Sequence, residues 1–233
     1  MRTATRYLVR QMRIADIPQV MEVERESFPS MWPPTAYKRE LQQNRLAHYI
    51  VVVEHRPAHT GARRGAQAPP AIEEPQPRQG GPVGRLLGEL RQILGGDDGR
   101  LPPPEQREEL VLGFVGVWLL PDEAHIVTIA VRDSHRRQGI GEFLLIAAIE
   151  LAQRAGQPLM TLECRVSNEP ALALYEKYGF QQLGLRPRYY SDTHEDALIL
   201  TTSSLLSLKY QAALEQLKRE HRQRWGDLAE RDG

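Results

Sequence analysis

The stretch that decides the fold runs from Ile129 to Gly141 and reads IAVRDSHRRQGIG. It opens with three apolar residues, two of them β-branched, as is typical of the end of a buried strand. A basic turn containing Arg136 and Arg137 follows, and glycines at 139 and 141 open a segment with helical periodicity. The sequence therefore predicts a strand, a basic turn and a helix in immediate succession.

This succession favours binding of a phosphate group. The first turn of a helix presents free backbone N–H groups and a partial positive charge, both of which attract anions. Glycines allow the backbone to approach a phosphate closely, and Arg136 and Arg137 add positive charge. The alternative is that the glycines only satisfy tight packing between strand and helix. We expect phosphate binding because strand, basic turn and helix occur in this order.

The rest of the chain predicts an α/β fold. Further strands are expected at 6–12, 49–53, 110–120, 124–131, 159–165, 180–185 and 197–201. Helices are expected from Asp16, as N-cap, to about Phe28, and at 35–44, 139–155, 169–178 and 203–225. The short Pro121-Asp122 turn joins two strands into an antiparallel hairpin. This order predicts a central sheet of mixed direction with helices on both faces.

Two segments differ from this core in composition. Residues 55–108 hold nine prolines and nine glycines, which indicates a low-complexity insertion within one domain that spans 6–202. The spacing from Leu86 to Leu94 predicts a short amphipathic helix inside the insertion. Residues 203–233 form a predicted C-terminal helical extension. Its predicted buried face holds Leu206, Tyr210, Ala213 and Leu217, and its predicted outer, basic face holds Lys218, Arg219, Arg222 and Arg224. We expect the basic face to be solvated, with a partner or oligomer contact as the alternative.

The bulk composition narrows the class of protein. Lysine plus arginine and aspartate plus glutamate each number 30, so no overall basic field draws the protein to nucleic acid or to an anionic membrane. The apolar runs are shorter than the roughly 20 residues that cross a bilayer, and residues 1–13 lack the pattern of a secretory signal. Cys164 is the single cysteine, which suits a reducing compartment. We expect a cytoplasmic protein with no direct nucleic-acid or membrane partner.

Longer motifs reveal a family resemblance. Residues 162–168 read LECRVSN and 171–180 read ALALYEKYGF, and shorter matches are FPSMW at 28–32, RYY at 188–190 and EDA at 195–197. Together with the R-x-x-G-x-G of the basic turn, they resemble the GNAT acetyltransferases, and within them the RimI-like enzymes that acetylate protein N-termini. The resemblance covers about 6–54 and 109–202 and not the insertion or the tail. It implies the GNAT fold, with a mixed, mostly antiparallel central sheet.

The resemblance implies acetyl-CoA as co-substrate and no metal. In the family, the strand pairs with the pantetheine arm and the turn binds the diphosphate. The residues implied are Ile129, Ala130, Val131, Arg136, Arg137, Gln138, Gly139, Ile140, Gly141, Glu142 and Asn168. Asn168 can also cap the next helix. Glu142 departs from the family pattern, and we expect its side chain to face solvent because an inward carboxylate would repel phosphate. The histidines show no metal-ligand spacing.

The chemistry needs a base for the amine and an acid for the departing thiolate. Glu163 lies on an apolar strand, where burial would raise its pKa, and Tyr175 lies on the following helix. By resemblance, Glu163 is the general base and Tyr175 the general acid. The alternatives are a Glu163 carboxylate paired with a neighbouring strand and a Tyr175 that is only a core aromatic. We expect Cys164 to be a small core residue rather than a nucleophile, and His125 to be structural.

Two loops are expected to flank the acceptor. By resemblance they contain Phe28 with Pro29 and Tyr189 with Tyr190, whose rigid apolar side chains suit a narrow slot for an extended N-terminus. The alternative is that the tyrosines pack on the sheet edge. The implied substrate is a protein N-terminus, and a ribosomal protein that begins with alanine is one candidate. Other functions left open are acetylation of lysine side chains or of a small-molecule amine, and a catalytically silent acyl-CoA-binding module.

Overall fold

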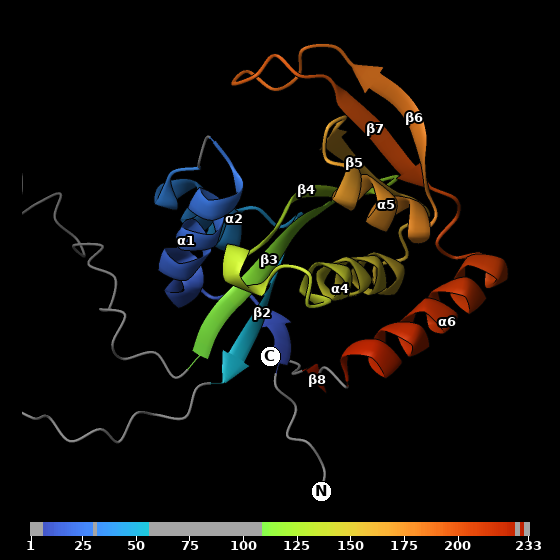
Figure 1. The fold of residues 1–233 in the computed structure, drawn as a ribbon, viewed down its shortest axis with the longest axis horizontal. Coiled ribbons are helices and arrows are strands. Elements are labelled where there is room, and N and C mark those ends of the chain that lie inside the picture. Colours follow the sequence, from blue (N-terminus) through green and yellow to red (C-terminus); the bar gives the residue numbers. More distant parts are fainter. Residues whose placement is uncertain (1–6, 30–31, 56–108, 227–228, 231–233) are drawn as a thin grey trace, which may run out of the picture. The chain divides into compact units, whose positions relative to one another are not determined.

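A twisted sheet organises the part of the chain that the computed structural model describes, residues 7–29, 32–55, 109–226 and 229–230 (Figure 1). Its eight strands follow the order β6-β7-β5-β4-β3-β2-β1-β8. They are β1 (Tyr7–Gln11), β2 (Ala47–His55), β3 (Glu109–Leu119), β4 (Ala124–Val131), β5 (Met160–Arg165), β6 (Phe180–Arg186), β7 (Ala197–Thr202) and β8 (Ala229–Glu230). Only β4 with β5 and β1 with β8 pair in parallel. The predicted mixed, mostly antiparallel sheet is confirmed.

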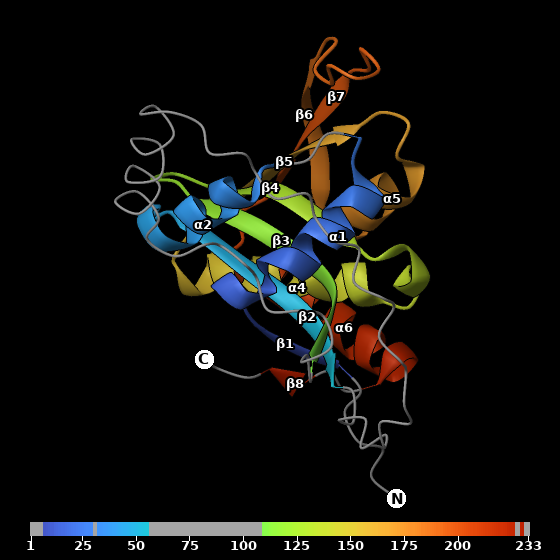
Figure 2. The same ribbon diagram turned by 90° about the vertical axis from the view of Figure 1, so that its left-hand side faces the viewer.

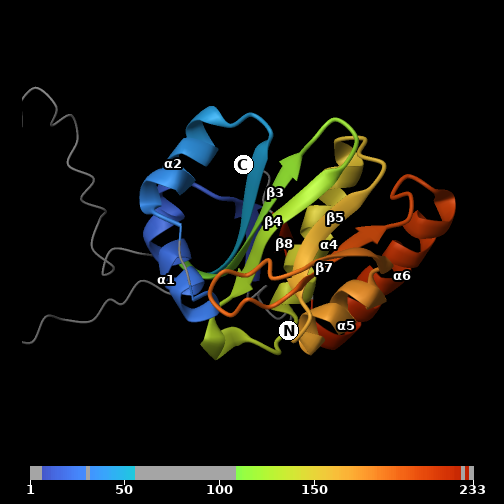
Figure 3. The ribbon, with the colours of Figure 1, turned by 90° about the horizontal axis from the view of Figure 1, so that it is seen from above.

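Helices cover both faces of this sheet, as predicted. They are α1 (Ile17–Ser27), α2 (Pro34–Gln43), α4 (Ile140–Arg154), α5 (Glu169–Lys177) and α6 (Leu208–Trp225), with short 3₁₀ turns at Ile14–Asp16 and Asp133–His135. Figures 2 and 3 show α1 and α2 on one face and α4, α5 and α6 on the other. Val20, Tyr37 and Phe114 belong to the core beneath α1 and α2, and Leu144 and Val115 to the core beneath α4. Among the described helices, none is long and apolar enough to cross a bilayer.

The helix α4 is bounded by glycines, as its sequence predicts. Gly139 is the N-cap with a φ of 79°, and Gly156 follows the helix with a φ of 75°. Glycine adopts this left-handed backbone without the steric cost that other residues incur. Between these ends, Leu144, Leu145 and Ile149 are fully buried against the sheet. Local sequence is therefore sufficient to place this helix.

The start of α1 differs from its prediction. The helix begins beside Asp16 and carries Pro18 in its first turn, but the Asp16 side chain does not cap it. The carboxylate instead accepts hydrogen bonds from the buried Arg10 guanidinium at 2.7 and 2.9 Å and from the Arg13 N–H at 2.7 Å. A buried guanidinium needs a bidentate acidic partner, and this requirement outweighs a cap. Asp16 occupies the predicted N-cap position, but the prediction that its side chain caps the helix is wrong.

Strand β4 separates from β5 part-way along its length. The register between β3 and β4 shifts after Gly116, where Val127 is the extra residue in β4. Such a bulge bends the strand and increases its twist. The parallel ladder between β4 and β5 ends at Ile126 and Leu162, although both strands continue. The C-terminal half of β4 therefore runs without β5 as a ladder partner.

The predicted insertion lies almost wholly outside the described residues, and so does the helix expected from Leu86 to Leu94. The strands that flank the insertion pair along their length, from Ala47 opposite Trp118 to His55 opposite Glu109. The domain boundaries at 6–202 and 203–233 stay predictions.

The buried face of α6 differs from the predicted one. Tyr210 is buried and Leu217 packs against the core, as expected, and Leu214 and His221 complete the face, whereas Ala213 and Leu206 are exposed. Leu206 precedes the helix, so it does not follow the helical period. Lys218, which was predicted on the basic outer face, is also largely buried, and its ammonium contacts the carboxylates of Glu150 and Glu215. The basic outer face is thus smaller than predicted.

Candidate active site

The basic turn between β4 and α4 is tied to α1. The Arg136 guanidinium donates to the Val131 carbonyl at 3.2 Å and to Ser27 Oγ at 3.2 Å, and lies 2.6 Å from Asp133 Oδ1. Arg137 has a φ of 62°, a left-handed conformation that is uncommon for a residue with a side chain. Strained backbone of this kind persists where the surrounding structure holds it, often at ligand sites. The turn is thus a fixed loop at the N-terminus of a buried helix.

The two glycines of this turn meet different requirements. A Cβ at Gly139 would lie 2.6–2.8 Å from ring atoms of Trp225, and the φ of 79° already favours glycine, so the fold needs glycine there. A Cβ at Gly141 would meet only Val131 Cγ2, at the ordinary contact distance of 3.5 Å. The fold therefore does not need glycine at 141. A bare backbone at the start of a helix suits the close approach of a diphosphate.

The Glu142 side chain does not point to solvent as predicted. Its Oε1 accepts a hydrogen bond from the Tyr178 hydroxyl at 2.8 Å and lies 2.6 Å from Lys177 Nζ, and only 15% of the side chain is exposed. Because Lys177 compensates the carboxylate charge, an acid is tolerated in the first turn of α4. The prediction of a solvent-facing side chain is wrong, because Lys177 and Tyr178 at the end of α5 bind this carboxylate.

Glu163 lies in β5 between two cationic or ionisable partners. Its Oε2 is 3.1 Å from His125 Nε2, and its Oε1 is 3.0 Å from the Arg186 guanidinium. The hydrogen bond from His125 lowers the pKa of Glu163, outweighing burial, which acts in the opposite direction, and Arg186 lowers it further. The expected rise in the pKa of Glu163 is therefore wrong, and the carboxylate is ionised at neutral pH.

His125 is the functional candidate that sequence reasoning missed. Its Nδ1 lies 2.9 Å from Thr161 Oγ1 and its Nε2 faces Glu163, so three side chains form one hydrogen-bonded chain. The parallel pairing of β4 with β5 brings residue 125 opposite Thr161, two residues from Glu163 on the same face. The signal in the sequence was a histidine on the strand before the basic turn, but its partner depends on the strand register.

Tyr175 is a core aromatic whose hydroxyl stays available. The side chain is 6% exposed and packs on Phe180, with ring centroids 5.6 Å apart. Burial raises the pKa of Tyr175, so the phenol keeps its proton at neutral pH. Within the described ranges the hydroxyl has no hydrogen-bond partner. Cys164 is buried as predicted, and burial raises the pKa of its thiol to about 11.

Glu163 and Tyr175 approach the end of β5 from opposite faces. Cys164 and Tyr175 belong to the core on the α4 side of the sheet. Because side chains alternate along a strand, Glu163 points to the other face, together with His125. A proton acceptor and a proton donor thus lie on either side of the strand that separates from β4.

Asn168 caps α5, as one of its two predicted roles requires. Its side-chain oxygen accepts a hydrogen bond from the Ala171 N–H at 3.4 Å.

The predicted pantetheine-binding residues of β4 pair with β3 on one side, Ile129 opposite Val115 and Val131 opposite Gly113. The opposite edge of these residues faces the side of β5, but the ladder between β4 and β5 ends before them, at Ile126 and Leu162. Nowhere in the described chain are three or more His, Cys, Asp or Glu side chains grouped to hold a metal ion.

The loop between β6 and β7 is held by Arg165. Its guanidinium stacks on the Tyr190 ring at 3.8 Å and pairs with Asp192 at 2.8 Å and Glu195 at 3.2 Å. The Tyr189 ring packs edge-on against Tyr190 at 5.2 Å and is 46% exposed. Arg165 has no local signal in the sequence, because its partners lie about 30 residues away in the chain.

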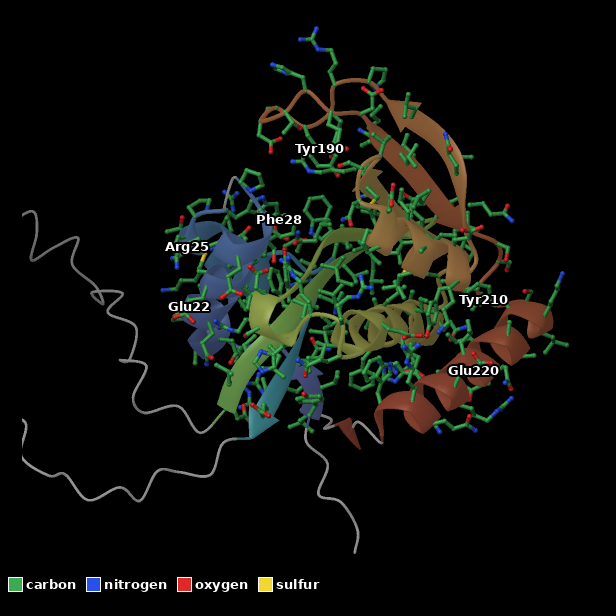
Figure 4. All side chains as sticks on the ribbon, viewed as in Figure 1. Glu22, Arg25, Phe28, Tyr190, Tyr210 and Glu220 are labelled. Atoms are coloured by element: carbon green, nitrogen blue, oxygen red, sulfur yellow. The ribbon has the colours of Figure 1, made fainter. Side chains whose placement is uncertain are left out.

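The two predicted acceptor loops lie toward the same end of the molecule. Figure 4 shows Phe28 after α1 and Tyr190 between β6 and β7 in that region. Phe28 and Tyr190 are half-buried and Pro29 is exposed. Tyr189 and Tyr190 contact each other and the guanidinium groups of Arg186 on the edge strand β6 and Arg165 on β5, so both the acceptor slot and packing on the sheet edge agree with their position.

Comparisons with known proteins agree with this geometry. Residues 80–180 match the Acetyltransferase (GNAT) family. A protein of Bacillus subtilis (strain 168), named provisionally as a ribosomal protein bS18-alanine N-acetyltransferase, is 32% identical over 196 residues, covering 84% of this chain and 95% of that protein. The crystal structure of the ribosomal-protein-S18-alanine N-acetyltransferase from Escherichia coli matches with a TM-score of 0.56 at 20% identity, over 86% of this chain and 96% of that chain.

A second solved structure shares the fold. The NatC complex bound to Gag peptide and CoA contains a chain that matches with a TM-score of 0.56 at 18% identity, covering 85% of this chain and 98% of that one. The Bacillus relative is similar over nearly its whole length, and the two solved acetyltransferases share the fold over 85–86% of this chain. The chain therefore belongs to the GNAT family of acetyltransferases.

Proposed function

We propose that the protein transfers the acetyl group of acetyl-CoA to the α-amine of a protein N-terminus. The observation that carries this proposal is the paired Glu163 and His125 beside the point where β4 and β5 separate. The basic turn that opens α4 lies at the far end of the same β4 strand. The provisional name of the Bacillus relative, a ribosomal protein bS18-alanine N-acetyltransferase, supports the choice of acceptor.

Acetyl-CoA fits the groups that the chain presents along β4. Backbone N–H groups at residues 139–142 open α4 and, with Arg136 and Arg137, would hold the diphosphate. The edge of Ile129–Val131 that faces away from β3 would pair with the amides of the pantetheine arm, and Asn168 would add a hydrogen bond. When bound, acetyl-CoA supplies the activated thioester. The bare backbone of Gly141 leaves room for the diphosphate without any requirement from the fold.

Glu163 and His125 would remove the proton of the attacking amine. An α-amino group has a pKa of about 7.7–8.0, so a modest base suffices near neutral pH. The pKa of Glu163 is lowered, which makes this carboxylate alone a weak base. An imidazole nitrogen can accept a proton, and His125 Nε2 lies 3.1 Å from Glu163 Oε2, so the two side chains together would form the proton acceptor. The ionised carboxylate would then stabilise the imidazolium that forms.

Tyr175 would donate a proton to the departing thiolate. Its phenol stays protonated because burial raises its pKa. It reaches β5 from the face opposite to Glu163, so the amine would be deprotonated on one side of the thioester while the sulfur is protonated on the other. The presence of both groups argues against a silent acyl-CoA-binding module.

An N-terminus suits the acceptor loops better than a lysine does. Phe28 and Pro29 on one side and Tyr189 and Tyr190 on the other offer rigid apolar walls, and tyrosine hydroxyls can bind the first amides of a peptide. Arg165 fixes Tyr190, so the slot would be preformed. We infer that the preferred substrates begin with a small residue, and that a ribosomal protein with an N-terminal alanine is one target. A cytoplasmic location stays a prediction.

The test is a panel of peptides that differ only in their first residue, each incubated with acetyl-CoA. We expect acetylation of the α-amine, fastest for alanine and serine, with the site assigned by tandem mass spectrometry. A peptide whose α-amine is already acetylated serves as control. Equal rates for every first residue would contradict the proposed slot, and no transfer to any peptide would contradict the acceptor class.

A further inference from the structure

The helix α6 lies outside the residues that match the family, yet it reaches back to the turn that opens α4. His221 Nε2 is 3.0 Å from the carbonyl oxygen of Gly139. The imidazole is 3% exposed and stacks on the Phe143 ring at 5.8 Å with an interplanar angle of 14°. One face of His221 therefore packs on the first turns of α4 while its ring edge bonds the helix N-cap.

Trp225, at the end of α6, covers the same glycine. Three of its ring atoms lie 2.6–2.8 Å from the position that a Cβ on Gly139 would take. The indole N–H makes no hydrogen bond within the described residues, so the ring acts here through contact alone. Trp225 and the left-handed backbone together explain why Gly139 is glycine.

Further contacts hold α6 in place beside α4 and α5. The Tyr210 hydroxyl donates to the Tyr178 carbonyl at 2.9 Å, and the Tyr178 hydroxyl donates to Glu142 in the first turn of α4. Lys218 contacts Glu150 on α4. Figure 4, in which Tyr210 and Glu220 mark two points of α6, shows the helix running beside α4. The position of α6 is therefore defined along its length rather than only at Gly139.

Peptide geometry gives the contact with Gly139 a consequence for anion binding. The carbonyl of Gly139 and the N–H of Ile140 belong to one planar, trans peptide unit, so they point in opposite directions. Fixing the carbonyl therefore fixes the direction of the Ile140 N–H. That carbonyl accepts two donors, the Phe143 N–H at 2.9 Å and His221 at 3.0 Å. The Ile140 N–H is one of the groups at the start of α4 that have no partner within the helix.

We propose that α6 positions the acetyl-CoA-binding turn, with His221 and Trp225 holding the Gly139–Ile140 peptide so that the Ile140 N–H faces the diphosphate. His221 is a positioning residue, because it acts on the cofactor only through the peptide that it bonds. The proposal rests on the proposed function, since it assigns the diphosphate of acetyl-CoA to this turn. It gives the C-terminal helix α6, which lies outside the residues 80–180 that match the family model, a role in cofactor affinity.

The experiment compares His221→Leu, which removes the donor, with His221→Gln, which keeps an N–H donor. Arg219→Ala, on the exposed face of α6, is the matched control. Calorimetry with acetyl-CoA alone should give a Kd raised roughly 3–10-fold for His221→Leu, the range for loss of one hydrogen bond. His221→Gln should recover part of that affinity, and Arg219→Ala should bind as wild type does. The peptide KM and the kcat at saturating acetyl-CoA should stay unchanged in all three.

Thermal melting separates positioning from a structural role. A lower Tm with an unchanged Kd for acetyl-CoA would overturn the proposal, because α6 would then only stabilise the fold. Should His221→Leu fail to fold, hydrogen exchange on the wild-type protein decides. Acetyl-CoA should slow exchange in 208–225, and an unchanged exchange rate there would overturn the proposal. A wild-type protein that binds no acetyl-CoA would instead refute the proposed function.

Discussion

Replacing Gly141 by aspartate tests the acetyl-CoA turn without disturbing the fold. The new Cβ would meet only Val131 Cγ2, at 3.5 Å, and the backbone is not left-handed there, so the variant should fold. An acidic residue in the first turn of a helix interacts favourably with the helix dipole, by about 0.3–1 kcal/mol. We therefore expect a Tm equal to or slightly above that of the wild type.

The same carboxylate should repel the diphosphate. At a separation of about 5 Å and an effective dielectric constant near 20, two like unit charges repel by about 3 kcal/mol. This corresponds to roughly a 100-fold rise in the Kd for acetyl-CoA. Gly141→Ala adds the Cβ without the charge and is the matched control, for which we expect a much smaller loss. Gly139→Ala differs from both, because its left-handed φ and the contact with Trp225 should lower the Tm.

Calorimetric titration with acetyl-CoA and thermal melting are the two measurements. In Gly141→Asp we expect the affinity for acetyl-CoA to fall while the Tm stays equal or rises slightly. Binding of acetyl-CoA within threefold of wild type would refute the position of the diphosphate at this turn. A strongly lowered Tm would refute the conclusion that the fold does not need glycine at 141.

The remaining predictions concern catalysis, the acceptor loop and stability. Glu163→Gln and Tyr175→Phe should each lower kcat by roughly 10²–10⁴-fold with little change in acetyl-CoA affinity, and steady-state kinetics showing a wild-type rate in the double variant would remove both from the mechanism. The hydrogen bond with His125 lowers the pKa of Glu163 in the folded protein. The ionised Glu163 should therefore stabilise the fold fully above about pH 4.5, and this contribution should be lost as the pH falls through the folded-state pKa. Acid unfolding followed by circular dichroism should therefore be less steep in Glu163→Gln, and identical profiles would contradict this sign. Arg165→Ala should release Tyr190 and raise the peptide KM several-fold at constant acetyl-CoA KM, so equal rises in both constants would indicate general damage. Shortening 55–108 to a few Gly/Ser residues should leave the Tm nearly unchanged, because loop-closure entropy grows slowly with length. A large drop in the Tm measured by thermal melting would show that the segment stabilises the fold.

The parts that the sequence predicts correctly are those with local signals. The glycines at 139 and 156 mark the ends of α4 because left-handed backbone favours glycine, and the apolar period between them identifies the buried face. The strand, turn and helix at 129–141 follow one another without a long connection. Asn168 caps the helix that begins directly after it. Each of these features depends on residues within a few positions in the chain.

The parts that the sequence misses depend on distant partners. Glu142 binds Lys177 at the end of α5, 35 residues later in the chain. The pKa of Glu163 depends on His125, which reaches it only through the parallel pairing of β4 with β5. The helical period that places Tyr210 on the buried face of α6 also places Leu214 and His221 there, but local patterns do not show that His221 stacks on Phe143 of α4. Charge partners across a sheet follow from register and topology, which local patterns do not specify.

The most direct test of the central claim is a competition between two peptides in one reaction with acetyl-CoA. One peptide has a free N-terminal alanine and no lysine, and the other has the same sequence with a blocked N-terminus and one internal lysine. Mass spectrometry follows both products over time. Transfer to an N-terminus by the groups around Glu163 predicts acetylation of the free α-amine, with the lysine peptide unmodified over the same period. Acetylation of the internal lysine at the same rate would contradict it.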